Sequence, residues 1–190
     1  MPSLSASADQ ILDVAIEAVR RGGPELGELL DTLPAPIYTT DAEGRVTFYN
    51  RACIAFAGRQ PVAGEDRWCV TWKLFTTGGK PLPHDRCPMA VAIREKRSVR
   101  GTEAVAERPD GTRRHFCPYP TPLLNEAGEL VGAVNMLVDV TDRYHAAHLL
   151  DQAKRCRRLV RAVNDQLTID TLTSMAEDYE AKARELQRPH

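Results

Sequence analysis

The chain has no long apolar run, no excess of either charge and no dense set of cysteines. Its longest apolar stretch, residues 130–138, is interrupted by Gly132 and Asn135. It falls far short of the roughly 20 residues that a membrane-spanning helix needs, so we expect no association with a membrane. The N-terminal residues also lack a basic segment followed by an apolar one, so we expect no secretory signal.

The five cysteines are odd in number and widely spaced. This pattern excludes the disulfide framework of a small secreted protein and favours reduced thiols in a cytoplasmic protein. Lys and Arg number 25 against 26 Asp and Glu, for a net charge of -1. Because the charges balance so closely, we expect no overall attraction to nucleic acid. With 43% hydrophobic residues, the chain can bury a core without metal or disulfide bonds.

Three zones follow one another along the chain. Residues 1–33 have apolar residues at helical spacing and predict a helical flank that ends at Pro34. Residues 34–140 contain two β-prone runs, then helical segments, then three further β-prone runs, which predicts an α+β domain around one antiparallel sheet. Residues 141–190 contain no glycine and predict helix, either as one bent helix or as a helical hairpin.

Small and apolar residues of the last zone recur at heptad spacing. The repeat runs through Leu149, Ala153, Cys156, Val160, Val163 and Leu167, and then through Ile169, Leu172, Ala176, Tyr179, Ala183 and Leu186. An apolar stripe of this kind has to be covered by another element. We expect the helices that flank the middle zone to form a homodimer. The alternative is that these stripes pack on the protein's own sheet.

The middle zone carries several short motifs in a fixed order. They are the helix-to-strand segment 29–38, the segment 40–52 (TDAEGRVTFYNRA), the turn 109–112, the apolar strand 128–138 and the segment 139–143 (DVTDR). Together these motifs resemble the PAS domain, a small sensor module of bacterial signalling proteins, and the resemblance covers more than half of the chain. Residues 79–90 resemble a subgroup of these domains found ahead of bacterial histidine kinases.

The resemblance implies a five-stranded antiparallel sheet whose helices enclose a pocket, and a function in sensing or interaction. A histidine kinase also needs an ATP-binding domain, and no glycine-rich nucleotide box follows His145 and His148. We therefore expect no enzyme activity. The chain would be a stand-alone sensor that signals through its flanking helices to a separate effector, such as a kinase or a regulator. The signal-coupling residues that the resemblance implies are Asp139, Thr141, Asp142 and Arg143.

Bulky and polar side chains of the middle zone are the candidates for lining the pocket. They are Tyr38, Phe48, Phe56, Trp68, Trp72, Phe75, Asn135 and Met136. Asn135 is the most informative of these residues because it interrupts an otherwise apolar strand, and a buried amide needs hydrogen-bond partners. Its side chain would either orient a ligand or bond to a neighbouring helix. These residues do not by themselves specify a cofactor.

Two His–Cys pairs make a haem- or metal-dependent sensor an alternative function. His84 and Cys87 lie at the start of a predicted helix, and His115 and Cys117 lie on one face of a predicted strand. Two such pairs contain the ligand types of a tetrahedral zinc site, and the resemblance implies a haem ligand near His84. The plainer interpretation is that His84 caps the helix and Cys87 is a small core residue. The residues around Cys53 do not match the light-sensing motif, so we expect no flavin photochemistry.

The helical zone contains a basic cluster at residues 154–161. Because nearby positive charge activates an exposed thiol, Cys156 is the candidate for a redox role or an intersubunit disulfide. The simpler interpretation of Cys156 is a small residue of the heptad stripe. The cluster also makes a DNA-binding regulator a second alternative. A solvated helix face is simpler, with Glu177, Asp178 and Glu180 neutralising the cluster if the helices fold back.

Overall fold

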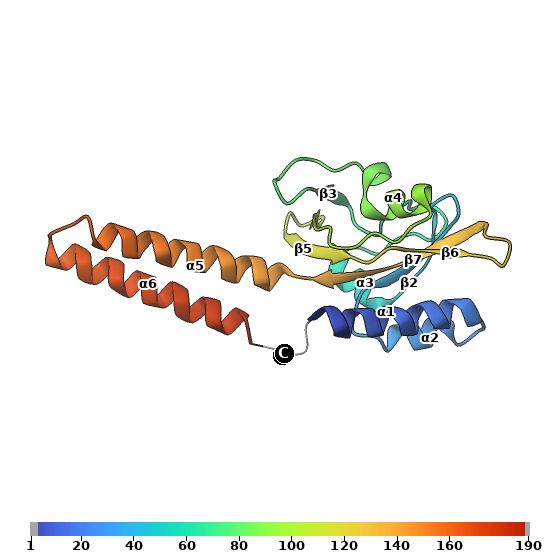
Figure 1. Ribbon diagram of the computed structural model, residues 1–190, viewed down its shortest axis with the longest axis horizontal. Coiled ribbons are helices and arrows are strands. Elements are labelled where there is room, and N and C mark those ends of the chain that lie inside the picture. The colour runs from blue at the N-terminus through green and yellow to red at the C-terminus, as the bar shows by residue number, and fades with distance from the viewer. Residues whose placement is uncertain (1–3, 189–190) are drawn as a thin grey trace. The chain divides into compact units, whose positions relative to one another are not determined.

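The computed structural model describes residues 4–188, with side chains from residue 8 onward. It divides into two compact units, the first ending at Asp139 and the second beginning at Val140. Figure 1 shows the mixed α/β unit and the helical unit. The N-terminal helices, which the sequence sets apart as a flank, belong to the same unit as the sheet.

Seven strands form the sheet of the first unit. They are β1 (Ile37–Asp41), β2 (Val46–Tyr49), β3 (Lys73–Phe75), β4 (Ala104–Glu107), β5 (Arg113–Pro118), β6 (Thr121–Leu124) and β7 (Leu130–Asp139). Their order is β2-β1-β7-β5-β4-β3, with β6 also paired to β7, and every pairing is antiparallel. This confirms the predicted α+β class and antiparallel sheet.

The strand count exceeds the expected five for two reasons. A short strand, β3, forms at the sheet edge. The single irregular strand predicted over residues 113–124 is divided into β5 and β6 around Pro118 and Pro120, since proline has no N–H to donate to a ladder.

Helices cover both faces of this curved sheet. They are α1 (Leu4–Arg21), α2 (Leu26–Asp31), α3 (Arg51–Ala57), the 3-10 turn η1 (His84–Arg86) and α4 (Pro88–Glu95). Figure 1 shows α1 and α4 on opposite sides of the sheet. Each side has its own buried core. We call the face toward α4 the inner face and the face toward α1 the outer face.

The outer core joins α1 to the two central strands. Leu12 of α1 is only 2% exposed and belongs to one cluster with Ile37 of β1 and with Val134 and Met136 of β7. The apolar stripe of the N-terminal helix is therefore covered by the protein's own sheet, which was the alternative to a role in dimerisation. The helix is amphipathic because its buried residues recur at three- and four-residue spacing.

Asn50 fixes the junction between α2, β1 and α3. Its Oδ1 accepts hydrogen bonds from the backbone N–H groups of Ile37 and Cys53, at 3.0 and 3.2 Å. Its Nδ2 donates to the carbonyls of Leu30 and Ala35, at 3.0 and 2.9 Å. The amide is 1% exposed, and these four bonds use its full donor and acceptor capacity.

The second unit is a helical hairpin of α5 (Thr141–Val160) and α6 (Gln166–Leu186). Of the two arrangements open from the sequence, the structure adopts the hairpin. Small residues meet between the helices, namely Ala153, Cys156 and Ala176. Arg157 and Glu180 form a two-bond ion pair across the seam, at 2.9 Å for each bond. No helix among residues 4–188 is both long enough and apolar enough to span a membrane.

We predict that the substitution Leu12→Ala will lower the free energy of unfolding by about 2–5 kcal/mol, because it leaves a cavity between α1 and the sheet. Val14 is 48% exposed on the same helix, and Val14→Ala should change this free energy by less than about 0.5 kcal/mol. Chemical denaturation of both variants measures the difference. Equal effects would contradict the packing of α1 on β1 and β7.

Candidate functional site

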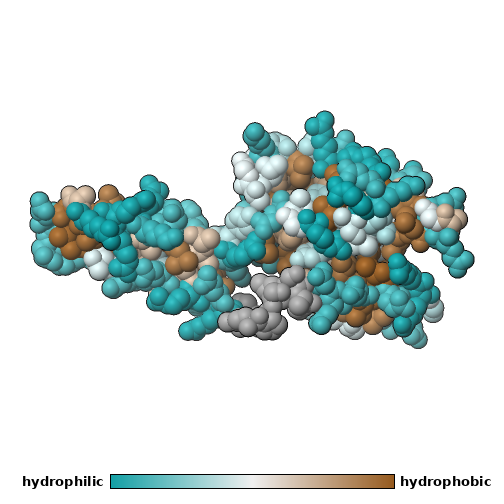
Figure 2. Space-filling model, viewed as in Figure 1, coloured by the Kyte–Doolittle hydropathy of each residue, from teal (hydrophilic) through white to brown (hydrophobic). Residues whose placement is uncertain are grey.

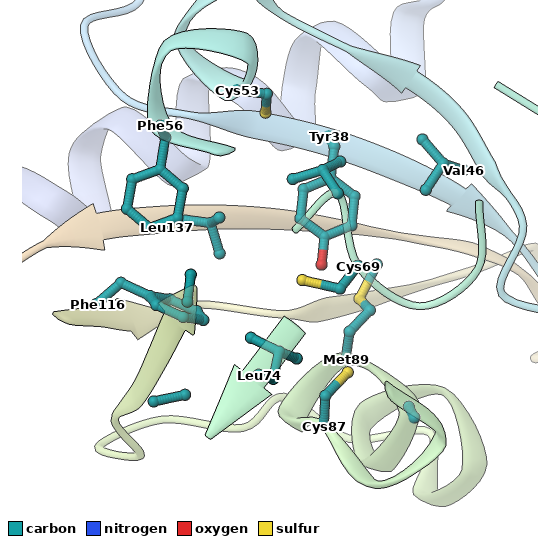
Figure 3. Close-up of a cluster of buried hydrophobic side chains, with 14 of the residues drawn as sticks. Tyr38, Val46, Cys53, Phe56, Cys69, Leu74, Cys87, Met89, Phe116 and Leu137 are labelled. Atoms are coloured by element: carbon teal, nitrogen blue, oxygen red, sulfur yellow. The ribbon is translucent and has the colours of Figure 1, made fainter. Parts of the chain in front are cut away.

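The inner core of the first unit is filled with side chains. Phe56 of α3 and Phe116 of β5 meet edge to face with ring centroids 5.5 Å apart, and Leu137 of β7 is fully buried in the same cluster. Figure 3 shows these residues around Tyr38, together with sulfur atoms of Cys69, Cys87 and Met89. Of the side chains predicted to line a pocket, Tyr38 and Phe56 pack in this buried cluster.

A chain of hydrogen bonds crosses this core. Asn135 of β7 lies directly opposite Tyr38 of β1 in the sheet register. Its Nδ2 donates to the Tyr38 hydroxyl at 2.9 Å, and this hydroxyl donates to the carbonyl of Trp68, also at 2.9 Å. The Oδ1 of Asn135 accepts from the backbone N–H of Tyr119 at 2.9 Å. The amide therefore bonds to a neighbouring strand and to the chain ahead of β6, rather than to a helix.

Trp68 has an unusual backbone conformation at the end of this chain. Its φ is +68°, a value that is strained for a bulky residue. Its N–H donates to the carbonyl of Gly44 at 2.7 Å, and its ring lies so close to Gly44 that a Cβ there would overlap the ring. The Gly44 turn, the Tyr38 hydroxyl and the packed indole together hold the strained backbone in place.

The titratable groups of the inner core are held neutral by burial. Burial is the largest cause that raises the pKa of Tyr38, of Cys53 and of Cys69, and it raises the pKa of Cys87 to about 12. The Cys69 thiol shares a 3.1 Å hydrogen bond with the Thr71 hydroxyl. A core with these protonated groups is polar without being charged.

Thr40 contributes a further polar group. Its side chain is 4% exposed, and its hydroxyl has no hydrogen-bond partner within the described part of the chain. Thr40 pairs with Val46 and Ala133, two members of the inner cluster. Because directly paired residues share a sheet face, the Thr40 hydroxyl lies on the inner side. Neither Thr40 nor Cys69 is among the site residues predicted from the sequence.

Two predicted pocket residues lie on the outer face instead. Phe48 and Met136 pack in the outer cluster with α1. Met136 follows Asn135 directly, and successive residues of a strand point to opposite faces. Phe48 is two residues after the inner residue Val46, but a register shift in the β1–β2 pairing lies between them and reverses the alternation.

The remaining aromatic candidates lie near the sheet edge. Trp72 is 45% exposed, with the Lys73 ammonium 3.9 Å from its ring centroid. Phe75 is partly buried under the Arg113 guanidinium, 4.4 Å from its ring centroid. Both aromatic residues line a shallow apolar hollow of about 320 Å³ beside Leu82. This hollow lies on the surface, outside the inner core.

The two His–Cys pairs are not brought together. Cys87 belongs to the inner cluster, whereas His115 and Cys117 flank the inner residue Phe116 on β5 and therefore point to the other face. No group of three or more His, Cys, Asp or Glu residues suited to a metal ion occurs among the described residues. Burial lowers the pKa of His84. The four residues are therefore not brought together as the tetrahedral zinc site of the alternative interpretation requires.

Cys156 and the basic cluster at residues 154–161, the candidates for a redox or DNA-binding role, lie at the C-terminal end of α5 in the hairpin. Cys156 is 7% exposed between α5 and α6, so its thiol lacks the exposure that a reactive cysteine needs. Arg157 is paired with Glu180, as expected for helices that fold back. Lys154, Arg158 and Arg161 remain on the exposed surface.

The residues implied in signal coupling lie where β7 continues into α5. Asp139 is the last residue of β7 and pairs with Arg114 at 3.5 Å. Thr141, which is buried, and Asp142 lie in the first turn of α5. The Arg143 guanidinium lies 5.7 Å from the centroid of the Tyr144 ring. These four residues therefore span the junction between the two units.

We predict that Tyr38→Phe will lower the free energy of unfolding by roughly 1–3 kcal/mol, because it leaves the Asn135 amide and the Trp68 carbonyl without their buried partner. Tyr49 supplies a matched control, since its hydroxyl accepts an exposed 3.3 Å bond from Gln60. Tyr49→Phe should change the free energy by less than about 0.5 kcal/mol. Urea denaturation that finds no difference would contradict the hydrogen-bond chain.

We also predict a loss of stability at alkaline pH. The buried thiols and the Tyr38 hydroxyl have a higher pKa in the folded protein than in the unfolded chain. Their contribution to stability is complete below the pKa of the unfolded chain and is lost as the pH rises from there toward the pKa of the folded protein. Each buried thiol that stays protonated should lower the unfolding free energy by about 1.4 kcal/mol per pH unit above about pH 9. Cys69→Ala should reduce the steepness of this pH dependence by the contribution of one thiol, about 1.4 kcal/mol per pH unit.

The control for this pH experiment is Val46→Ala, which removes part of the same buried cluster without a titratable group. It should lower the stability at every pH and leave the slope unchanged. Denaturation curves from pH 8 to 11 give both quantities. A Cys69→Ala slope equal to that of the parent would show that this thiol ionises normally in the folded state.

Comparison with known proteins agrees with the geometry. The sequence model of the PAS fold matches residues 30–145, and no curated protein matches the chain. The LOV protein of Rhodobacter sphaeroides is 12% identical, over 93% of this chain and 98% of that one, with a TM-score of 0.44. The LOV domain of a blue-light activated histidine kinase from Erythrobacter litoralis is 23% identical, over 57% and 98%, with a TM-score of 0.45.

A further solved structure, the PAS domain of a protein from Colwellia psychrerythraea, is 19% identical over 60% of this chain and 92% of that one, with a TM-score of 0.42. The match to the family covers more than half of the sequence and includes every strand of the sheet. The order of motifs, the antiparallel sheet and this match lead to one conclusion: the chain belongs to the PAS fold family.

Proposed function

We propose that the protein is a non-enzymatic cytoplasmic sensor or adaptor that acts as a homodimer. A small molecule or a partner engages the PAS core, and the change reaches a separate effector, such as a kinase or a regulator, through α5 and α6. The observation that carries this proposal is the hydrogen-bond chain from Trp68 through Tyr38 to Asn135.

The chain of bonds ends on the strand that leads to the hairpin. Asn135 lies four residues before Asp139, the end of β7, and α5 begins at Thr141. A change at Trp68 that removes its bond to Tyr38 alters the hydrogen bonding of β7 directly. We propose that this buried network is the two-state element of the coupling, with the Tyr38–Trp68 bond formed in one state and broken in the other.

The chemistry of the core favours an uncharged ligand. The polar groups available inside are the Tyr38 hydroxyl, the Asn135 amide and the Thr40 hydroxyl, and thiols and apolar side chains surround them. A charged ligand would lose its hydration without gaining a buried counter-charge. A ligand can enter between these packed side chains if they move, and movement of Trp68 would relieve the strain in its backbone.

Native mass spectrometry and an absorbance spectrum of the purified full chain test ligand occupancy. We expect a colourless protein, and bound small molecules should be neutral and weakly polar. The relay is tested by hydrogen exchange: Tyr38→Phe should speed exchange in residues 134–150, whereas Tyr49→Phe should leave it unchanged. Unchanged exchange in Tyr38→Phe would exclude this network as the route, and a catalytic activity of the isolated chain would exclude a purely sensory function.

A further inference from the structure

A shallow apolar hollow opens beside β3, at the edge of the sheet. We call it the β3 hollow; its volume is about 320 Å³ and its lining residues are 72–75 and 81–84. Trp72 is 45% exposed there, whereas Phe75 and Leu82 are partly buried. Figure 2 shows hydrophobic patches on the surface of the sheet unit, between its hydrophilic side chains. Apolar groups of this unit are therefore not confined to its two cores.

The chain after β3 folds back and holds the hollow in shape. The N–H of Leu82 donates to the carbonyl of Leu74 at 2.8 Å, and the N–H of Thr76 donates to the carbonyl of Lys80, also at 2.8 Å. Gly79 closes the turn with a φ of +81°, a conformation that glycine adopts without strain. Because these bonds already fix the backbone, a partner that binds here does not have to order it.

Trp72 gives the hollow the side chain that interfaces most often use as an anchor. A single exposed apolar residue is ordinary on a protein surface, but Trp72 borders an apolar depression that also contains Phe75 and Leu82. Tryptophan has a large apolar area and is enriched among the residues whose truncation weakens binding most. An apolar side chain placed in the hollow would cover the exposed part of this indole.

The rim of the β3 hollow is positively charged. The Lys73 ammonium and the Arg113 guanidinium lie 3.9 and 4.4 Å from the centroids of two aromatic rings that line the hollow. Both cations share one carboxylate, that of Glu107, at 3.6 and 2.8 Å. Lys80 is exposed and directly precedes the lining residues 81–84. Three cations beside one carboxylate leave this rim positive, although the chain as a whole has a net charge of -1.

We propose that the β3 hollow binds an acidic segment of a partner protein. One large apolar side chain of this segment packs against Trp72 and Leu82, and carboxylates beside it pair with Lys73 and Lys80. The contact with the indole supplies most of the affinity, and the cations select an acidic partner over a basic one. The hollow lies outside the inner core, so this inference goes beyond the proposed function.

A single-stranded nucleic acid also combines flat rings with negative charge, but the hollow suits it less well. Proteins that bind such strands have a basic groove that follows the phosphates over several nucleotides. The β3 hollow is lined chiefly by aromatic, leucine and proline side chains, with its cations at the rim. This arrangement fits an apolar side chain with flanking carboxylates.

The test is the binding of a short fluorescein-labelled peptide to the full chain, measured by fluorescence anisotropy. The probe has a central leucine–phenylalanine pair between runs of glutamate. We expect a Kd tighter than about 1 mM. Binding should weaken at least tenfold when lysines replace the glutamates of the probe, or when serines replace its leucine–phenylalanine pair.

Trp72→Ala should weaken binding of the acidic probe at least tenfold, because it removes the indole that the apolar side chain covers. Leu124 supplies the matched control, since it is 44% exposed on β6, outside the hollow. Leu124→Ala should bind the probe as tightly as the parent. Circular dichroism of both variants checks that they are folded.

A charge variant tests the rim independently of Trp72. Lys73→Gln with Lys80→Gln should weaken binding by roughly threefold or more and should reduce its dependence on salt between about 0.1 and 1 M NaCl. The matched control is Lys154→Gln with Lys182→Gln, which neutralises two exposed lysines of the helical unit. This control should bind the probe as the parent does.

Three results would overturn the inference. They are a Kd for the acidic probe weaker than about 1 mM, equal binding by Trp72→Ala and Leu124→Ala, and tighter binding of a labelled oligothymidine strand than of the peptide. The last result would identify the hollow as a nucleic-acid site. None of them bears on sensing by the inner core, which the exchange experiment on Tyr38→Phe tests separately.

Discussion

Strand β7 is the element on which both cores of the PAS unit depend. It lies between β1 and β5 and also pairs with β6. Its residues alternate strictly, with Val134 and Met136 in the outer core under α1 and with Asn135 and Leu137 on the inner side. A strand that is buried on both faces cannot slip by one residue without exchanging the two sets. The position of Asn135 opposite Tyr38 is fixed by this requirement.

Much of the fold follows from local sequence. The turns at residues 41–44 and 109–111, the β-prone runs around them and the helical zone after residue 140 indicate an α+β domain with helical flanks, and the structure agrees. Two features depended on long-range geometry. The register shift in the β1–β2 pairing turns Phe48 to the outer face, and the stripe of α1 is covered by apolar residues on the outer face of the sheet.

The candidate site was predictable only in part. Tyr38, Trp68 and Asn135 were each suggested by their size or polarity, but Tyr38 and Asn135 are 97 residues apart in sequence. Their pairing is set by the β1–β7 register, which no local pattern encodes. The alternation of side chains along a strand is enough to place Met136 and Asn135 on opposite faces of the sheet. This pattern could have been read from the sequence. The two His–Cys pairs failed to converge because Cys87 lies in the inner core, whereas His115 and Cys117 point from the opposite face of β5.

The packing of α1 sets the true extent of the PAS unit. The family match begins at residue 30, yet Leu12 and its neighbours on α1 seal Ile37, Val134 and Met136 from water. A fragment that starts near residue 30 would expose this cluster to solvent as an apolar patch. The patch would lie on a strand that also supports the inner core. Any protein that binds there must first displace the amino-terminal helix, which therefore acts as a built-in competitor for that side of the sheet.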